Sequence, residues 1–238
     1  MKIILLIGFF DSFLFPRGML YDKQFNPAHL HETKIEVLLT TETRFELSDL
    51  RTYEIYSQVD RYALRAASFG NADYRENFLE FGFGFPVGRN FAFGLTIAGL
   101  NSWIKDISNN FAYTLKAGGL FMADPFLVSA WINNINVPRI SSVDYVAVSY
   151  AVRFGYEATK VLHFDLTVRG VETELPFYNF GLKLSPHRSL LLGLSVNTRP
   201  MLLEYGVQLS LGRMIVNYSG NRHQQLGLTH NIGLGFVQ

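Results

Sequence analysis

The sequence contains no cysteine, which excludes disulfide bonds and thiolate metal sites. Charged residues are scarce as well: they make up 17% of the chain, against about 25% in a typical soluble domain. The two signs nearly balance, with 21 Lys and Arg, 20 Asp and Glu, and a formal net charge of +1. This balance provides no basic field for nucleic acid, so we expect no nucleic-acid partner.

Long apolar runs are also missing. After the N-terminus no stretch approaches the ~18 uninterrupted apolar residues that indicate a membrane-spanning helix. The first residues, "MKIILLIGFF", place Lys2 before a short apolar run, which resembles the beginning of a secretory signal. We therefore expect residues 1–19 to be a signal peptide that directs the chain out of the cytoplasm.

What the sequence does contain is strict alternation from about residue 34 onward. The chain is 48% hydrophobic and 15% aromatic, with 21 Phe and 20 Gly, and helical periodicity is hard to find. In "YVAVSYAVRFGY" the even positions 146–156 are all apolar or aromatic, while the odd positions 147–155 are small apart from Arg153. A period of two residues with one apolar face is typical of β-strands.

The chemistry of the second face decides between two kinds of sheet. In a soluble sandwich the solvent face is usually rich in Lys and Glu, whereas here it consists mostly of Gly, Ala, Ser, Thr and Asn. An apolar outer band around a small, polar interior is typical of a transmembrane barrel. Short polar turns between the strands, such as "GRN" at 88–90, suit an up-and-down connection. Trp103, Tyr113, Tyr156, Tyr205 and Tyr218 are candidates for aromatic residues at the membrane interfaces.

The pattern therefore predicts an all-β protein, an antiparallel up-and-down transmembrane β-barrel of about 14 strands. We expect residues 20–33 to be a short periplasmic segment and residues 34–238 to form the barrel, with both termini on the periplasmic side. An unusually apolar soluble barrel is the alternative. The expected strands begin near residues 34, 51, 61, 76, 90, 111, 126, 144, 161, 176, 189, 202, 213 and 223.

The stretch "EFGFGFPVGRNFAFGL" at 80–95 tests this interpretation, because its glycines could also form a phosphate-binding loop. A dinucleotide fingerprint needs G-x-G-x-x-G between a strand and a helix; here the third glycine comes one residue late and no helical period follows. The glycines instead follow the pleat of two strands joined at Gly88 and Arg89. We expect the apolar set of this hairpin to face lipid and Gly82, Gly84 and Gly94 to face the interior. The apolar set is Phe81, Phe83, Phe85, Phe91, Phe93, Leu95 and Ile97.

Three further segments carry a family resemblance. "QFNPAHL" at 24–30 resembles the N-P-A-G-L signature of the FadL-like superfamily, on the positions Asn26, Pro27, Ala28 and Leu30, with His29 at the position of the glycine. "WINNINVP" at 131–138 is similar to an N-L-N-x-P segment of the PorV-type branch. The C-terminal stretch from residue 203 resembles the last three strands of that branch, and its final strand alternates toward Phe236.

This resemblance implies a fourteen-stranded barrel in the outer membrane of a diderm bacterium, in contact with outer-membrane lipid. It further implies either a transporter of hydrophobic small molecules or a scaffold that binds subunits of a secretion machine. Members with transport activity carry an N-terminal hatch inside the barrel. Few residues separate the expected signal from Asn26, so we expect no such hatch here.

Candidate chemistry is concentrated on one strand. His163, Asp165 and Arg169 share one face at about 6.8 Å per two residues, and Arg153 and Glu204 face inward from other strands. We interpret these five residues as a lumenal polar network, in which His163 and Arg169 flank an ionised Asp165. A general-base row on the same strand is the alternative.

No motif identifies a catalytic, cofactor or metal site. There is no G-x-S-x-G elbow, and His223 and His230 are too far apart along one strand to chelate a metal together. We therefore expect no cofactor and no enzymatic activity. A lipid-modifying barrel enzyme, a hydrolase or an acyltransferase, is the alternative to transport.

Overall fold

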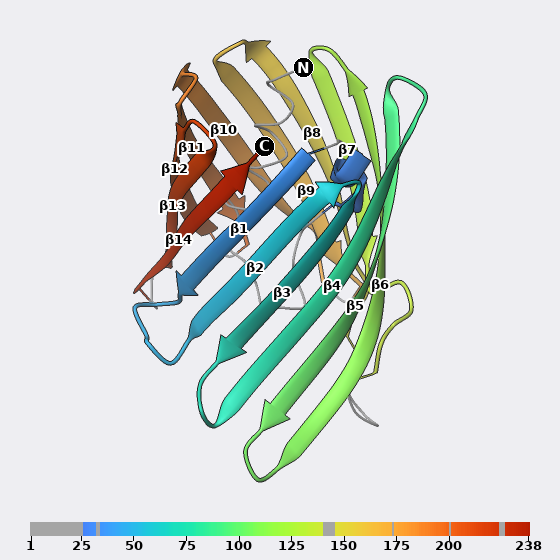
Figure 1. Ribbon diagram of the computed structural model, residues 1–238, viewed down its shortest axis with the longest axis vertical. Helices are drawn as coiled ribbons and strands as arrows, with labels where there is room; N and C mark the ends of the chain where they lie inside the picture. Colours follow the sequence, from blue (N-terminus) through green and yellow to red (C-terminus); the bar gives the residue numbers. More distant parts are fainter. Residues whose placement is uncertain (1–25, 32–33, 140–145, 173, 200, 224–226) are drawn as a thin grey trace.

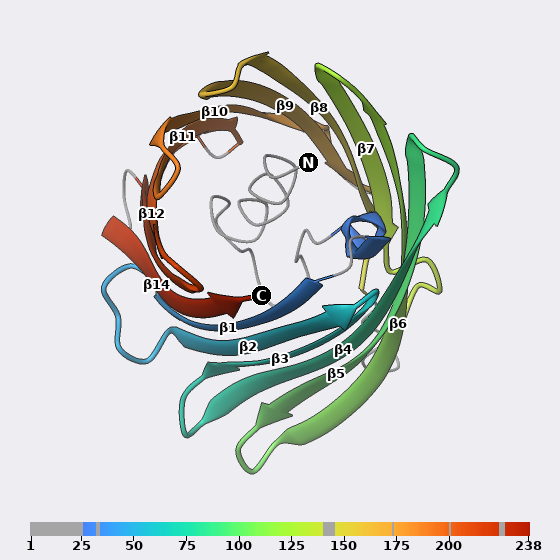
Figure 2. The ribbon, with the colours of Figure 1, turned by 45° about the horizontal axis from the view of Figure 1, so that its top comes forward.

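The computed structural model describes residues 26–31, 34–139, 146–172, 174–199, 201–223 and 227–238. In these residues fourteen antiparallel strands close into one barrel, in which each strand pairs with the next and β14 pairs with β1 (Figures 1 and 2). The expected up-and-down barrel of about fourteen strands is confirmed. The strands are β1 (Lys34–Thr43), β2 (Arg51–Asp60), β3 (Tyr62–Gly70), β4 (Tyr74–Val87), β5 (Phe91–Ile104), β6 (Ser108–Ala123), β7 (Phe126–Asn133), β8 (Ser149–Thr159), β9 (Leu162–Val171), β10 (Phe177–His187), β11 (Leu190–Thr198), β12 (Met201–Leu211), β13 (Met214–His223) and β14 (Gly227–Val237).

A single short helical element precedes the barrel within the described residues, the 3₁₀ turn η2 (Pro27–His31). No helix in the described ranges is long and apolar enough to cross a membrane. The expected signal peptide, residues 1–19, and the first part of the expected periplasmic segment lie outside the described residues.

Strand starts follow the alternation closely, with two notable differences. β8 begins at Ser149 instead of residue 144, because the preceding residues leave the wall and Val146 packs against an apolar cluster inside the barrel. That cluster is built from Phe69, Phe78, Leu100 and smaller neighbours. β14 begins at Gly227 instead of residue 223, because His223 still belongs to β13. His223 and His230 therefore lie on different strands, contrary to the sequence-based expectation.

The outward face is apolar, as the alternation predicted. On the β4–β5 hairpin Phe81, Phe91 and Leu95 are 49%, 49% and 56% exposed, whereas Gly82 and Gly84 between them are buried. Phe83 and Phe85 are half-buried because they stack on each other, with ring centroids 5.8 Å apart. On β8 the exposed set is Tyr150, Phe154 and Tyr156. The outward assignment of the even positions thus holds for residues 150–156 and does not extend to Val146.

The two ends of the barrel differ. At one end the strands are joined by tight turns of one to three residues, and the chain enters β1 and leaves β14 at this same end. The β4–β5 turn uses Gly88 at a φ of 69° and the β12–β13 turn uses Gly212 at 66°, a region that favours glycine. The other end carries the longer connections, including residues 44–50 and 134–148. Short periplasmic turns and longer external loops are typical of outer-membrane barrels.

A row of polar side chains marks where the outward apolar surface stops. The Ser68 hydroxyl donates to Asn77 Oδ1 at 2.9 Å, and Asn77 Nδ2 donates to Asn101 Oδ1 at 3.1 Å. Asn101 Nδ2 continues the row to Asn109 Oδ1 at 2.7 Å, on β6. Below this row the outward positions of β4 are apolar from Leu79 to Val87, a height of about 20 Å at the tilt of such barrels. β4, β5 and β6 continue past the row and project beyond their neighbours (Figure 1).

A matched pair of substitutions tests this outward surface. Leu194 lies mid-strand on β11 and Leu47 lies in the 44–50 loop, and the two side chains are 45% and 52% exposed. Leu194→Arg should cost roughly 2–4 kcal/mol because it buries a charge in the hydrocarbon layer, whereas Leu47→Arg should cost under about 0.5 kcal/mol. The measurement is the urea midpoint of the barrel in lipid vesicles. Equal losses for the two variants would contradict the assignment of a lipid-facing belt.

Candidate functional site

Residues Asn26 to His31 lie inside the barrel, against the inner wall formed by β4, β5 and β6 (Figure 2). Asn26 is 3% exposed, and Ala28 and Leu30 are completely buried. The sequence had placed these residues in a periplasmic segment. The structure instead brings Asn26, Pro27, Ala28 and Leu30 together onto the wall, so that a short interior segment occupies this side of the lumen.

Glycines make room for this segment. Gly84 on β4 faces Leu30 so closely that a Cβ at residue 84 would lie 2.6 Å from the Leu30 carbonyl carbon. Gly94 on β5 and Gly118 on β6 approach Pro27 and Asn26 even more closely, and Gly82 lies under the end of the Leu30 side chain. At Gly84 and Gly94 the short contacts are with backbone atoms and leave no room for a side chain. Together with Gly82 and Gly118 these glycines form a seat for residues 26–31, which we call the glycine seat.

Asn26 fixes the segment to the seat and shapes its turn. Its Nδ2 donates to the carbonyl oxygen of Gly119 at 3.0 Å, which anchors it to β6. Its Oδ1 accepts from the Ala28 amide at 2.9 Å, an Asx-type bond that starts the turn. The His29 amide then donates to the Asn26 carbonyl at 3.1 Å. An aspartate at residue 26 could accept from Ala28 but could not donate to Gly119. Pro27 has no amide hydrogen and therefore needs no hydrogen-bond acceptor at the start of the turn, so the N-P-A order suits this seat.

A second feature of the lumen is a buried ion-pair cluster on β8, β9 and β10. Asp165 on β9 pairs with Arg153 Nε at 2.9 Å and with Lys183 Nζ at 3.6 Å, and all three side chains are at most 4% exposed. The residues directly beside Asp165 in the sheet are Gly155 and Gly181. A Cβ at residue 181 would lie 2.7 Å from the carboxylate. The absent side chains let the two cations reach across to Asp165 from the neighbouring strands.

The five residues of the expected polar network all lie on the inner face, and all are buried. Arg169 lies further along β9, where its guanidinium is stacked over the Phe177 ring at 5.8 Å. His163 is opposite Lys183 in the β9–β10 register. Glu204 on β12 accepts from the Ser195 hydroxyl at 2.8 Å and also from Asn197 Nδ2. The closest cationic partners of Asp165 thus come from β8 and β10, whereas the sequence interpretation had taken Arg169 from the same strand.

The opposite wall carries two further buried pairs. Arg65 on β3 is 3.0 Å from Glu54 on β2, and Lys116 on β6 is 3.2 Å from Glu80 on β4. The Lys116–Glu80 pair crosses over β5, whose inward residues at this level are Thr96 and Ala98. An unpaired buried charge is strongly destabilising, and in both pairs the buried cation lies beside a carboxylate.

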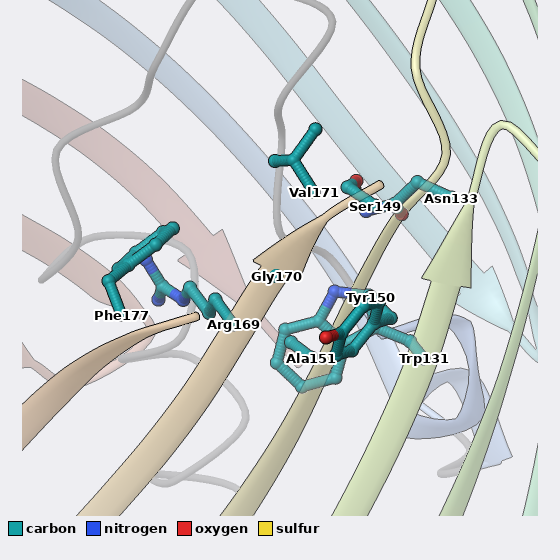
Figure 3. A pocket seen from close by; sticks show the side chains of 9 residues that line it. All are labelled: Trp131, Asn133, Ser149, Tyr150, Ala151, Arg169, Gly170, Val171 and Phe177. Atoms are coloured by element: carbon teal, nitrogen blue, oxygen red, sulfur yellow. Dashed lines mark hydrogen bonds between the residues drawn. The ribbon is translucent and has the colours of Figure 1, made fainter. Parts of the chain in front are cut away.

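A small cavity lies near the loop end of the lumen, between β7, β8, β9 and β10 (Figure 3). Its volume is about 10 Å³, which is room for one water molecule. Trp131, Asn133 and Arg169 lie along it, with Tyr150 and Phe177 at its sides (Figure 3). The indole N–H of Trp131 is buried there without a hydrogen-bond partner. The cavity is too small for an organic ligand and suits a bound water.

The N-x-N-x-P segment at 131–138 has a structural role. β6 pairs with β7 only from Lys116 onward, so its upper edge lacks a strand partner within the described residues. Asn136 replaces that partner: its Oδ1 accepts from the Leu115 amide at 2.9 Å, and its Nδ2 donates to the Tyr113 carbonyl at 2.8 Å. Asn134 adds a bond from the Thr114 hydroxyl at 2.7 Å. The two asparagines thus cap the exposed edge of β6 and hold the 134–138 loop against it.

No group of His, Asp and Glu among the residues that the structure describes could hold a metal ion. Sequence reasoning also missed the glycine seat, because the spacing of glycines 82, 84 and 94 shows that they face inward and does not show what covers them. The N-P-A segment does not reveal its position either, because the contact between Pro27 and Gly94 forms only when β4, β5 and β6 are assembled into the wall.

Comparison with known proteins places the fold. No family model matches the sequence, and no curated protein matches it. Among solved structures, the monoaromatic hydrocarbon channel CymD aligns with a TM-score of 0.62 at 10% identity, over 89% of this chain and 90% of that chain. The toluene transporter TbuX of Ralstonia pickettii also gives 0.62 at 10% identity, over 90% and 92%. The outer membrane protein Omp33 of Acinetobacter baumannii gives 0.57 at 14% identity, over 87% and 98%.

These alignments define the class of the fold. The chain shares the fold of these barrels, and the fourteen-stranded closed barrel that the resemblance implied is confirmed. The descriptions of these structures name a channel, a transporter and an outer-membrane protein, and none names an enzyme.

The glycine seat can be tested with a glycine from the same wall as control. Gly94→Ala should lower the free energy of unfolding by roughly 1–3 kcal/mol, because the new methyl group overlaps Pro27. Gly119→Ala should be neutral or slightly stabilising, because its Cβ would meet only the Phe93 ring, at 3.6 Å. Both are measured as urea midpoints in detergent.

A double substitution sharpens this test. If Gly94→Ala and Asn26→Ala both release the same segment, their effects should be strongly non-additive, and the double variant should lose little more than the worse single variant. Additive losses would show that residues 26–31 are not held as one unit.

The Asp165 cluster yields a second prediction. Asp165→Asn should cost about 3–5 kcal/mol, since it removes the buried carboxylate that Arg153 and Lys183 both contact. The control is Asp73→Asn, because Asp73 pairs with Lys105 at 3.6 Å with both side chains more than half exposed; its cost should be under about 1 kcal/mol. The measurement is the urea midpoint of unfolding of each variant in detergent. An unchanged midpoint for Asp165→Asn would reject the structural role and favour a catalytic one.

Proposed function

We propose that this protein is an outer-membrane transport barrel for small hydrophobic compounds. The observation that carries the proposal is the fold shared with a hydrocarbon channel and a toluene transporter over about nine tenths of each chain. The apolar outward belt and the orientation of turns and loops fit an outer-membrane location in a diderm bacterium. The proposed cargo is the class of compound named for these two proteins, small aromatic hydrocarbons.

The interior supports a narrow path better than an open pore. Residues 26–31 occupy the β4–β6 side of the lumen, and paired charges line the walls on both sides. At the loop end, Phe69, Phe78 and Leu100 form an apolar inner surface against which Leu50 and Val146 pack. A hydrophobic solute that enters from the loops would meet this surface first.

Two alternatives are less well supported. A role as scaffold for a secretion machine rests on the resemblance at residues 131–138, and the asparagines there are occupied in capping β6. A lipid-modifying enzyme needs a nucleophile beside a base. The buried Asp165 is instead placed between two cations, so we assign no catalytic residue.

Uptake of an apolar dye tests the proposal. Cells of a Gram-negative host that make the protein should take up N-phenylnaphthylamine, which an intact outer membrane excludes, faster than cells with an inactive control. Vesicles that carry the purified protein should admit sugars slowly, because the lumen is obstructed. A correctly inserted barrel with no dye uptake would favour the scaffold, and release of fatty acid from phospholipid would favour the enzyme.

A further inference from the structure

The tight-turn end of the barrel carries a ring of cations. Of the six tight turns, five have one Arg or Lys at the tip and the sixth is Asp124–Pro125. All five cationic side chains are exposed. They are Arg61 between β2 and β3, Arg89 between β4 and β5, Lys160 between β8 and β9, Arg188 between β10 and β11, and Arg213 between β12 and β13.

This ring is not neutralised by the protein itself. None of the five cations forms an ion pair within the described part of the chain, and the acids at this end are the exposed Asp60 and Asp124 and the half-buried Glu157. The loop end is different, because exposed acids and cations are both frequent there and Lys105 pairs with Asp73 at 3.6 Å. The exposed acids of the loop end are Glu46, Asp49, Asp73, Asp106, Glu172 and Glu174, and its exposed cations are Arg75, Lys105, Arg139, Arg199 and Arg222. The positive excess is therefore confined to the tight-turn end.

The cations also lie at the edge of the apolar belt. Tyr62 directly follows Arg61, and Met214 directly follows Arg213; both apolar side chains are about half exposed on the outward face. Long Arg and Lys side chains at such an edge keep their stems along apolar surface and place their charges at the level of lipid headgroups. The ring is thus at the height of the phosphates of the adjoining leaflet.

We propose that this ring binds the phosphate groups of anionic phospholipids in the leaflet at the tight-turn end. A guanidinium matches a phosphate with two parallel hydrogen bonds, and cations close to an anionic lipid surface are each attracted to it. The distribution favours lipid over a protein partner: the charges come one to a hairpin and are spread around the barrel, whereas a protein would contact one side. The inference rests on the proposed membrane location and not on the proposed cargo.

Native mass spectrometry on the folded, detergent-solubilised barrel tests this. The protein is mixed with phosphatidylglycerol or with phosphatidylcholine, and the lipids retained are counted. We expect preferential retention of phosphatidylglycerol, which falls as ionic strength rises. The variant Arg89→Gln, Arg188→Gln, Arg213→Gln should bind phosphatidylglycerol roughly a hundredfold more weakly. These side chains are exposed, so the variant should fold normally.

The control removes the same number of charges from the other end. Arg139→Gln, Arg199→Gln, Arg222→Gln should keep the preference of the unmodified protein. Equal retention of the two lipids by the unmodified protein would overturn the proposal, as would an unchanged preference in the tight-turn variant or a loss confined to the loop-end variant. This experiment does not measure dye uptake. A negative dye-uptake result would therefore leave the lipid proposal standing, and a lack of lipid preference would leave the proposed transport function standing.

Discussion

The closing pair of strands, β1 with β14, is the contact on which the rest of the structure depends. The register runs from Glu36 opposite Val237 to Thr43 opposite His230 and gives every strand a partner on both sides. Hydrocarbon offers no hydrogen bonds to a free backbone amide or carbonyl, so a sheet with open edges cannot cross a bilayer. Once the sheet is closed, the pleat assigns each side chain to lipid or to the lumen. The edge of β6 that has no strand partner lies toward the loop end, where the amide of Asn136 takes the place of a strand.

The inner face has a different task, because it must accommodate both a segment of chain and several buried charges. Where residues 26–31 lie on the inner wall, the wall residues beneath them are glycines, as at Gly84 and Gly94. Where charges are buried, they are paired across strands, and small residues beside them leave the space for long side chains to meet. Glycine therefore has two uses in one lumen: it admits a backbone on β4–β6 and a carboxylate on β9–β10.

Much of this architecture can be predicted from the sequence, because the apolar period of two residues is a local property. This period predicted the number of strands, the side chains that face outward and the positions of tight turns, including the turn at Gly88. Pairings between strands could not be predicted in the same way. Whether Asp165 meets Arg169 on its own strand or Arg153 and Lys183 on its neighbours depends on register and on the glycines at 155 and 181. Residue 146 continues the alternating pattern of β8 and yet turns into the lumen, since only the packing against Phe78 and Leu100 decides its side. The position of Asn26 likewise depends on a wall formed some sixty to ninety residues later in the chain.

The projecting sheet of β4, β5 and β6 has a practical consequence. Its β5–β6 tip, residues 105–107, stands beyond the polar row of Asn77 and Asn101, and Ile107 there is 79% exposed. β4 pairs with β5 up to Tyr74 and Ile104, and Lys105 at the tip donates its amide to the Asp73 carbonyl at 2.9 Å. Under the proposed outer-membrane location, a peptide epitope inserted at residue 106 would stand clear of the lipid headgroups, which makes this hairpin a suitable site for antibody labelling.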